Sequence, residues 1–240
     1  MNSKYIGNLR KRFGLALYKH KLINEDDKIL IALSGGKDSF ALLDLLSDRL
    51  KYLPFSIELA AIHIHIDNIG YQSDVTMLEQ ICKERNVPFF LKNFEVTQEQ
   101  ERKKSVCFWC SWNRRKAIFT FSKELGFNKL AFGHHMNDAV ETLLMNQIYH
   151  GSISSLPYRF SMFDGRIELI RPLLDFLNDE LLTYSKYLGY KPQLKECPHE
   201  NTCRNAMREQ VVELAKLNKV ATKNIFRSMN KICNDYLPQV

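Results

Sequence analysis

Three groups of residues in this sequence have the types and spacing that chemistry needs. The first is SGGKDS at 34–39, where two adjacent glycines lie between hydroxyl side chains and precede a lysine and a carboxylate. The second is GHHMNDAVET at 133–142, which combines histidines with acidic residues. The third is a C-x-x-C pair, Cys107 and Cys110, with Cys197 much later in the chain. Together they offer an anion loop, carboxylates and thiolates.

The SGGKDS loop lies between a predicted strand at 28–33 and a helix in which leucines recur at helical spacing up to Leu50. Such a loop aims backbone N–H groups and the positive end of a helix dipole at one point, where an anion binds. Its glycines are adjacent and not four residues apart, so it differs from the phosphate loop of ordinary nucleotide hydrolases. The absence of G-x-G-x-x-G argues against a dinucleotide. The loop predicts a phosphate site of another kind.

Strand-like and helical stretches alternate from residue 28 to residue 150, and they predict an α/β protein with a doubly wound, Rossmann-like parallel sheet. The C-terminal helices are expected to pack on this sheet. We expect three segments: an N-terminal helix at 1–27, a catalytic domain at 28–217 and a packed C-terminal helix at 218–240. Strands are expected at 28–33, 57–67, 87–91, 130–132 and 167–174; helices at 5–20, 73–85 with Ser73 as cap, 111–125, 137–150, 178–188, 205–217 and 223–236; loops at 95–106 and 151–163.

Composition indicates a globular protein, with 45% hydrophobic and 25% charged residues in a chain of 240. The basic N-terminus lacks the apolar core of a signal peptide, and no stretch reaches the roughly 18 apolar residues of a membrane span. We therefore expect a cytoplasmic protein that does not enter a membrane. A formal net charge of +7 suits a polyanionic partner.

Polar residues at the predicted strand ends extend the phosphate site. In an open parallel sheet ligands collect at the carboxyl ends of strands, which predicts ATP contacts from Asp67, Gly133 and His134. Asp138 would lie in the first turn of a helix opened by Asn137. Its carboxylate either caps that helix or joins Asp38 in a Mg-ATP site, and we favour the second role.

The cysteines predict a metal centre, because two thiolates three residues apart can reach one site. Cys203 leaves two alternatives open. Four thiolates would close a tetrahedral zinc site with a structural role, whereas three would hold an iron–sulfur cluster with one iron open. A redox disulfide is a third possibility.

These motifs resemble, in order and spacing, the TtcA-type tRNA 2-thiocytidine synthetases, a group of PP-loop ATP pyrophosphatases. The resemblance runs from about residue 8 to residue 214 and includes the RPL sequence at 171–173 and the Asn205 and Arg208 segment. It implies a homodimeric tRNA thiolase that uses Mg-ATP, a 4Fe-4S cluster and sulfur from a cysteine desulfurase to thiolate cytidine at position 32. Glu200 stands where the family usually has a second cysteine.

Carried over onto this sequence, the resemblance assigns pyrophosphate binding, catalysis, cluster ligation and tRNA contact to named positions. A PP-loop protein with structural zinc that only binds nucleotide or RNA, and a tRNA thiolase acting on a uridine, are the alternatives. The assigned residues are Ser34, Gly35, Gly36, Lys37, Asp38 and Ser39 for ATP, Lys37, Asp38 and Asp138 for catalysis, Cys107, Cys110 and Cys197 for the cluster, and Lys103, Lys104, Arg114, Arg115 and Lys116 for tRNA.

Overall fold

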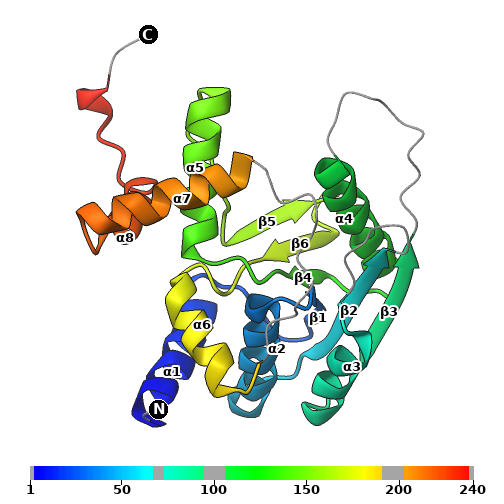
Figure 1. Ribbon diagram of the computed structural model, residues 1–240. Coiled ribbons are helices and arrows are strands. Elements are labelled where there is room, and N and C mark those ends of the chain that lie inside the picture. The colour runs from blue at the N-terminus through cyan, green and yellow to red at the C-terminus, as the bar shows by residue number, and fades with distance from the viewer. Residues whose placement is uncertain (1–2, 67–72, 95–105, 191–202, 238–240) are drawn as a thin grey trace.

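The structure is a computed structural model that describes residues 3–66, 73–94, 106–190 and 203–237, with only the backbone described at 106–108. The described residues contain one six-stranded sheet in the order β3-β2-β1-β4-β6-β5 (Figure 1). All neighbouring pairs are parallel except β5 with β6. The strands are β1 Lys28–Ala32, β2 Glu58–Ile66, β3 Phe89–Phe94, β4 Lys129–Ala131, β5 Arg159–Met162 and β6 Ile167–Ile170.

Eight α-helices surround this sheet in the described part of the chain. None of them is long and apolar enough to cross a membrane. Short 3-10 turns at Leu50–Tyr52 and Asn234–Tyr236 complete the regular structure. The helices are α1 Ser3–Lys19, α2 Lys37–Arg49, α3 Val75–Glu84, α4 Val106–Glu124, α5 Met136–His150, α6 Asn178–Tyr187, α7 Cys203–Leu217 and α8 Ala221–Ser228.

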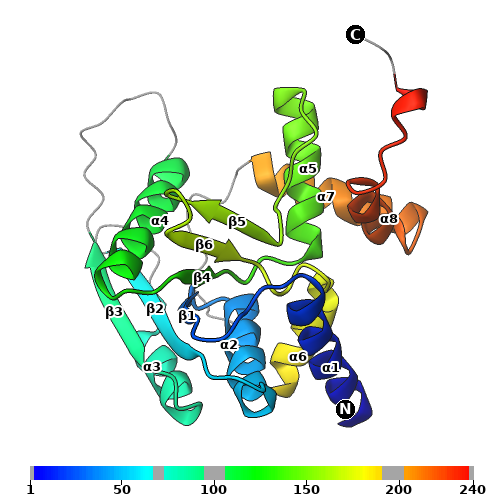
Figure 2. The same ribbon diagram turned by 180° about the vertical axis from the view of Figure 1, so that it is seen from behind.

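Side chains of the central strands alternate between two apolar layers, which confirms the predicted α/β class. In β1, Ile29 and Ile31 pack with residues of α1, α2, α3 and α6, whereas Leu30 packs with residues of α4 on the opposite face. Figures 1 and 2 show α4 across the sheet from α2 and α3. Both faces are thus buried, as the continuous apolar runs of β1 and β2 require.

The strand order reverses between β1 and β4, because β1 pairs with β2 on one side and with β4 on the other. The connections that leave the carboxyl ends of these two strands run in opposite directions and leave a crevice there, where ligands of open α/β sheets bind. Both the SGGKDS loop after β1 and the GHH stretch after β4 open onto this switch point.

Of the predicted C-terminal helices, α6 packs in the apolar layer over β1, whereas α7 and α8 pack on α5, so the expectation was wrong for these last two. Val211 of α7 and Phe226 of α8 form a third apolar cluster with Val140 of α5 and with Leu174. Helices α7 and α8 are amphipathic, and each packs its apolar side against α5. The segment boundaries at 27/28 and 217/218 stay a prediction.

The most consequential difference from the predicted elements is the start of α4. It begins at Val106 and not at residue 111, so the C-x-x-C pair lies at the N-terminal end of the helix and not in the loop before it. The polar loop predicted at 95–106 falls almost wholly outside the described residues. Cys107 and Cys110 are therefore one helical turn apart on the backbone.

Other element ends also differ. The predicted loop at 151–163 contains the antiparallel edge strand β5, whose connection to β6 places Phe163 and Asp164 at φ of 53° and 57°. Asp74, not Ser73, caps α3, with its carboxylate accepting from the Met77 N–H at 3.0 Å. The helix predicted at 223–236 is shorter than expected. Helix α8 has about two turns and ends at Ser228.

Candidate nucleotide-binding cleft and cysteine site

The SGGKDS loop is held together by its own hydroxyl groups. The Ser34 hydroxyl donates to the Ser39 hydroxyl at 3.1 Å and accepts from the Gly36 N–H at 3.3 Å, and the Ser39 hydroxyl donates to the Gly36 carbonyl at 2.9 Å. Gly35 has a φ of 85°, which L residues rarely adopt. Helix α2 begins next, with no side-chain cap at Gly36. Its first backbone N–H groups are thus available to an anion.

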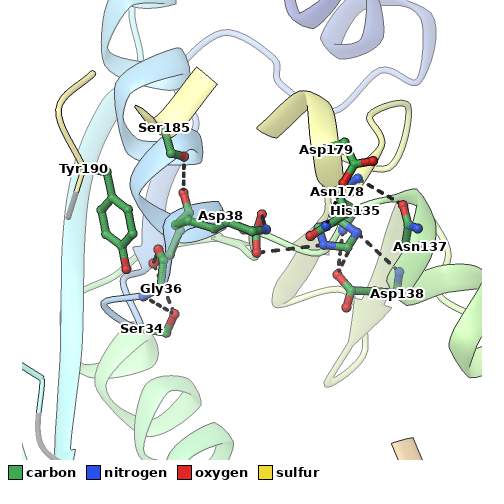
Figure 3. A network of polar contacts seen from close by, with 12 residues as sticks. Ser34, Gly36, Asp38, His135, Asn137, Asp138, Asn178, Asp179, Ser185 and Tyr190 are labelled. Atoms are coloured by element: carbon green, nitrogen blue, oxygen red, sulfur yellow. Dashed lines mark hydrogen bonds and ion pairs between the residues drawn. The ribbon is translucent and has the colours of Figure 1, made fainter. Parts of the chain in front are cut away.

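Three side chains from distant parts of the chain bind the carbonyl oxygens of this loop. Ser73 donates to the Ser34 carbonyl at 3.1 Å, Tyr190 to the Gly35 carbonyl at 2.8 Å, and Ser185 to the Lys37 carbonyl at 2.9 Å. Figure 3 shows Ser185 and Tyr190 beside the loop. Because the carbonyl side of the backbone is satisfied by protein, its N–H side remains for a ligand. No sequence pattern marked these three residues as supports.

The stretch after β4 ends in a capping box at the start of α5. The Asp138 carboxylate accepts from the His135 N–H at 2.9 Å, and the Asp138 N–H donates to Nδ1 of His135 at 3.4 Å. Helix α5 thus begins at Met136 with His135 as cap, and the expectation that Asn137 opens it was wrong. Asn137 instead accepts from the Asn178 N–H at 3.0 Å (Figure 3). The capping role considered for Asp138 is present.

His135 lies between the two carboxylates that we predicted to share a site. Its Nε2 is 3.9 Å from an oxygen of Asp38, on the side opposite the Asp138 contact (Figure 3). Because Nδ1 accepts a hydrogen bond, the neutral ring carries its proton on Nε2, facing Asp38. Burial lowers the pKa of His135 and favours this neutral form. Burial alone would raise the pKa of Asp138, but its interactions with His135, including the hydrogen bond from the His135 N–H, outweigh burial and lower that pKa.

Gly133 lets the two loops touch. A Cβ placed on Gly133 would lie 3.0 Å from the Asp38 carbonyl carbon and 3.0 Å from the Ser39 nitrogen, tighter than nine in ten Cβ contacts in proteins. Only glycine fits here without moving the first turn of α2. The second loop is therefore fixed against the phosphate loop by direct backbone contact.

A cleft of about 550 Å³ opens where these loops meet, a size typical of small-molecule sites. Asp38 and Asp138 both line it, but Lys37 pairs with Asp38 at 2.6 Å and is absent from the lining. Asp67, predicted to contact ATP, lies outside the described residues. The predicted residues brought together in this cleft are Ser34, Gly36, Asp38, Ser39, Gly133, His134, Asp138, Arg114 and Arg115.

Sequence analysis did not assign Arg171 or Arg204 to a site, yet both line this cleft. Arg171 follows β6 and is buried, and Arg204 is in the first turn of α7. Arg171 was marked only as part of the RPL sequence. Its position at the carboxyl end of a parallel strand was the signal that could have found it.

The N-terminal end of α4 carries part of the predicted metal site. Cys110 is half-buried, and Cys107 precedes it by one turn of the same helix. Residues three apart on a helix have Cβ atoms about 5–6 Å apart on one face, so two thiolates from this turn can bind one centre. Cys197, Lys103 and Lys104 lie outside the described residues.

Cys203 begins α7 and is exposed. Its proximity to Tyr149 on α5 raises the pKa of the Tyr149 hydroxyl.

A second hollow, of about 670 Å³, lies along another side of α4 and is called the outer hollow here. Arg115 and Phe119 line both it and the cleft. The described residues that line it combine cations with aromatic side chains and include no carboxylate, a composition suited to single-stranded nucleic acid. The residues with these properties are Trp112, Arg115, Lys116, Phe119, Lys123, Phe127, Phe163 and Arg166.

His134 makes a pH-dependent contribution to stability. Burial lowers the pKa of His134 from 6.5 to about 4. The interaction with Asp138 opposes this shift, and the interactions with Arg171, Arg204 and His135 add to it. Between these values the unfolded chain binds more protons than the folded one, so the free energy of unfolding falls as pH falls. The full shift corresponds to roughly 3 kcal/mol.

Urea denaturation at about pH 7 and about pH 5 tests this effect, with His134→Gln as the comparison. We expect the wild type to lose more stability than the variant on acidification. Equal losses would show that His134 does not titrate in this way.

Together, the switch-point cleft and its glycine loop define a nucleotide-binding protein of the α/β class. The sequence model of the PP-loop domain matches residues 9–215. The chain belongs to the PP-loop domain family, and its relatives there are named tRNA-cytidine(32) 2-sulfurtransferase.

One of these relatives, from Pseudomonas putida (strain W619), is 31% identical, covering 95% of this chain and 85% of its own. Another, from Geobacter sulfurreducens, is 30% identical, covering 98% of this chain and 95% of its own. Among solved structures, the U34-tRNA thiolase NcsA from Methanococcus maripaludis with its 4Fe-4S cluster has a TM-score of 0.77, at 24% identity, covering 95% of this chain and 79% of that one. This similarity confirms the fold.

Proposed function

We propose that the protein is an ATP-dependent tRNA 2-sulfurtransferase that thiolates cytidine at position 32. The observation that carries this proposal is the cleft in which the SGGKDS loop meets Asp38 and Asp138, beside the helix that begins with the C-x-x-C pair. The names of relatives at about 30% identity over nearly the whole chain supply the base and its position.

The loop and the two carboxylates divide the work of binding Mg-ATP. The N–H groups at the start of α2 receive the pyrophosphate part of ATP, assisted by the helix dipole. Asp38 and Asp138 face the cleft from two loops, and carboxylate oxygens are the ligands Mg²⁺ takes in phosphate sites. Lys37, whose Nζ is 2.6 Å from Asp38, would be available to contact the phosphates when the Asp38 carboxylate binds Mg²⁺.

Adenylation makes the cytidine oxygen a good leaving group. The C2 oxygen attacks the α-phosphorus and pyrophosphate leaves. A sulfide-level sulfur then attacks C2, and AMP departs with the oxygen, so no net oxidation or reduction is needed. Neutral His135 faces Asp38 with its Nε2 at 3.9 Å and adds no positive charge beside the proposed Mg²⁺ site.

The donor set at the start of α4 suits an iron–sulfur cluster, since Cys107 and Cys110 occupy one face of one turn. We propose Cys107, Cys110 and Cys197 as ligands. A cluster bound by three thiolates supplies an iron position that can carry the incoming sulfur. The half-buried position of Cys110 beside apolar residues limits access of water to such a centre.

The tRNA is proposed to dock across α4. Arg114 and Arg115 line the cleft, and Lys116 lines the outer hollow. These cations suit phosphates, and the exposed Trp112 beside Lys116 offers a face for base stacking. Lys103 and Lys104 precede this helix and are proposed to add to the same surface. A homodimer in the cytoplasm completes the proposal, with sulfur supplied by a cysteine desulfurase and a thiol reductant that provides the two electrons needed to bring persulfide sulfur to the sulfide level.

The nucleotide products test the adenylation step. Under anaerobic conditions with tRNA, a sulfur source and Mg-ATP, we expect AMP and pyrophosphate in equal amounts, dependent on tRNA. Formation of ADP and phosphate would contradict the proposal, because transfer of the γ-phosphate is a different reaction.

Metal content separates a three-cysteine cluster from zinc held by four thiolates. We expect protein purified without oxygen to contain about four iron and four sulfide per chain, and Cys203→Ala to keep both. Cys110→Ala is the matched variant, expected to lose them. One zinc, no sulfide, and loss of the metal in Cys203→Ala would establish the structural zinc site instead.

A further inference from the structure

Four buried nitrogen atoms in the cleft have no hydrogen-bond partner within the described part of the chain. They are Nε of Arg114, Arg171 and Arg204 and Nδ1 of His134. All four residues line the cleft. Buried donors left without a partner are costly, so their presence on the wall of one cleft indicates a ligand that satisfies them.

The three arginines, called the arginine cluster here, come from three separate elements. Arg114 is on α4, Arg171 follows β6, and Arg204 is in the first turn of α7. Only tertiary packing brings them together. Arg171 is further fixed by a hydrogen bond from its guanidinium to the Pro157 carbonyl at 2.8 Å, which leaves Nε available.

Like charges accumulate in this part of the cleft. Burial, followed by the positive charge of Arg115, lowers the pKa of Arg171 to about 10. Arg171 and Arg204 both act on His134 and help to keep it neutral. An anion bound beside Arg171 would relieve its repulsion with Arg115, so the cationic wall of the cleft favours an anionic ligand.

The buried carboxylate of Glu141 is shared between an arginine of the cluster and one outside it. Glu141 lies 3.7 Å from Arg204 and 3.5 Å from Arg208, so one carboxylate is divided between two arginines. Its own Oε2 has no hydrogen-bond partner among the described residues. Arg208 does not line the cleft, whereas Arg204 does.

We infer that the arginine cluster binds a phosphate of the RNA substrate, separately from the pyrophosphate site of the SGGKDS loop. Guanidinium groups hold phosphate by paired N–H donors, which suits a phosphodiester. The loop N–H groups, Lys37 and Mg²⁺ already serve the phosphates of ATP under the proposed function. Arg115, next to Arg114, lines both the cleft and the outer hollow, so cationic lining continues from one to the other. The identity of the anion as RNA rests on the proposed function.

Direct binding measurements test this assignment with Arg114→Gln, Arg204→Gln and the matched control Arg208→Gln. Affinity for an unmodified tRNA transcript is measured across a salt series, and affinity for Mg-ATP by equilibrium dialysis. We expect both cleft variants to bind tRNA roughly 5- to 20-fold more weakly, with a salt slope lower by about one, and to bind ATP unchanged. Arg208→Gln is expected to match the wild type in both, although it too loses a contact with Glu141.

Three results would overturn the inference. A loss of ATP affinity with unchanged tRNA affinity would assign the cluster to a phosphate of ATP. Equal tRNA loss in all three variants would show that position in the cleft does not decide the effect. Unchanged binding throughout would show that these arginines do not contact the RNA. Circular dichroism and a thermal melt identify a variant that fails to fold. If Arg204→Gln fails to fold, Arg204→Lys is measured in its place. Because no sulfur transfer is measured, failure of the thiolation reaction leaves this test intact.

Discussion

The Asp38→Asn variant is expected to form AMP about 10²–10³ times more slowly than the wild type while remaining folded. Asp38 lines the cleft, pairs with Lys37 at 2.6 Å and faces His135 at 3.9 Å. The substitution keeps the shape of the side chain and removes the charge that Mg²⁺ requires. The steady-state rate of AMP formation with tRNA, at saturating Mg-ATP, measures the effect.

Asp179→Asn is the matched control for this variant. Asp38 and Asp179 both lie in the first turn of a helix, so both substitutions remove the same favourable interaction with a helix dipole. Asp179 is exposed and outside the cleft. A rate for Asp38→Asn within about threefold of the control would exclude Asp38 from the chemistry, since catalytic charges contribute far more than that.

The Gly133→Ala variant is expected to lose both stability and ATP affinity. The added methyl group would lie 3.0 Å from the backbone of Asp38 and Ser39, which is not a flexible side chain that can move away. Overpacking of this kind costs about 1–3 kcal/mol. The clash would displace the start of α2, whose N–H groups are proposed to bind the phosphates. We therefore expect binding of Mg-ATP to weaken roughly tenfold or more.

Gly7→Ala separates this clash from a general effect of glycine substitution. Gly7 is in α1, where an added Cβ meets nothing within 4 Å, so alanine there is expected to raise stability by up to about 1 kcal/mol. Chemical denaturation and ATP titration are compared for the two variants. Wild-type ATP affinity in Gly133→Ala would contradict the contact between the two loops.

The nucleotide-binding half of the fold was predictable because local signals determine it. A buried aliphatic strand, adjacent glycines and a leucine-rich helix identify β1, the loop and α2 without reference to the rest of the chain. The stretch around Gly133 was likewise identified from its own residues. Parallel strands then bring both loops to one edge of the sheet, which placed Asp38 and Asp138 in one cleft as predicted.

The parts that were missed depend on contacts between distant segments. Tyr190 and Ser185 support the loop from more than a hundred residues away, and nothing in their surroundings in the sequence marks them. The grouping of Arg171 and Arg204 with Arg114 likewise exists only after α7 packs on α5. Strand β5 is short and largely exposed, so it lacked the apolar pattern used to find the others.

The account is tested most directly by nucleoside analysis of the RNA product. An unmodified tRNA transcript with cytidine at position 32 is incubated without oxygen with the reconstituted protein, Mg-ATP and a sulfur source, then digested and analysed by mass spectrometry. We predict 2-thiocytidine in proportion to AMP, and none when that cytidine is replaced by uridine. Release of AMP and pyrophosphate without any thiolated nucleoside, or thiolation of the uridine transcript instead, would contradict the account.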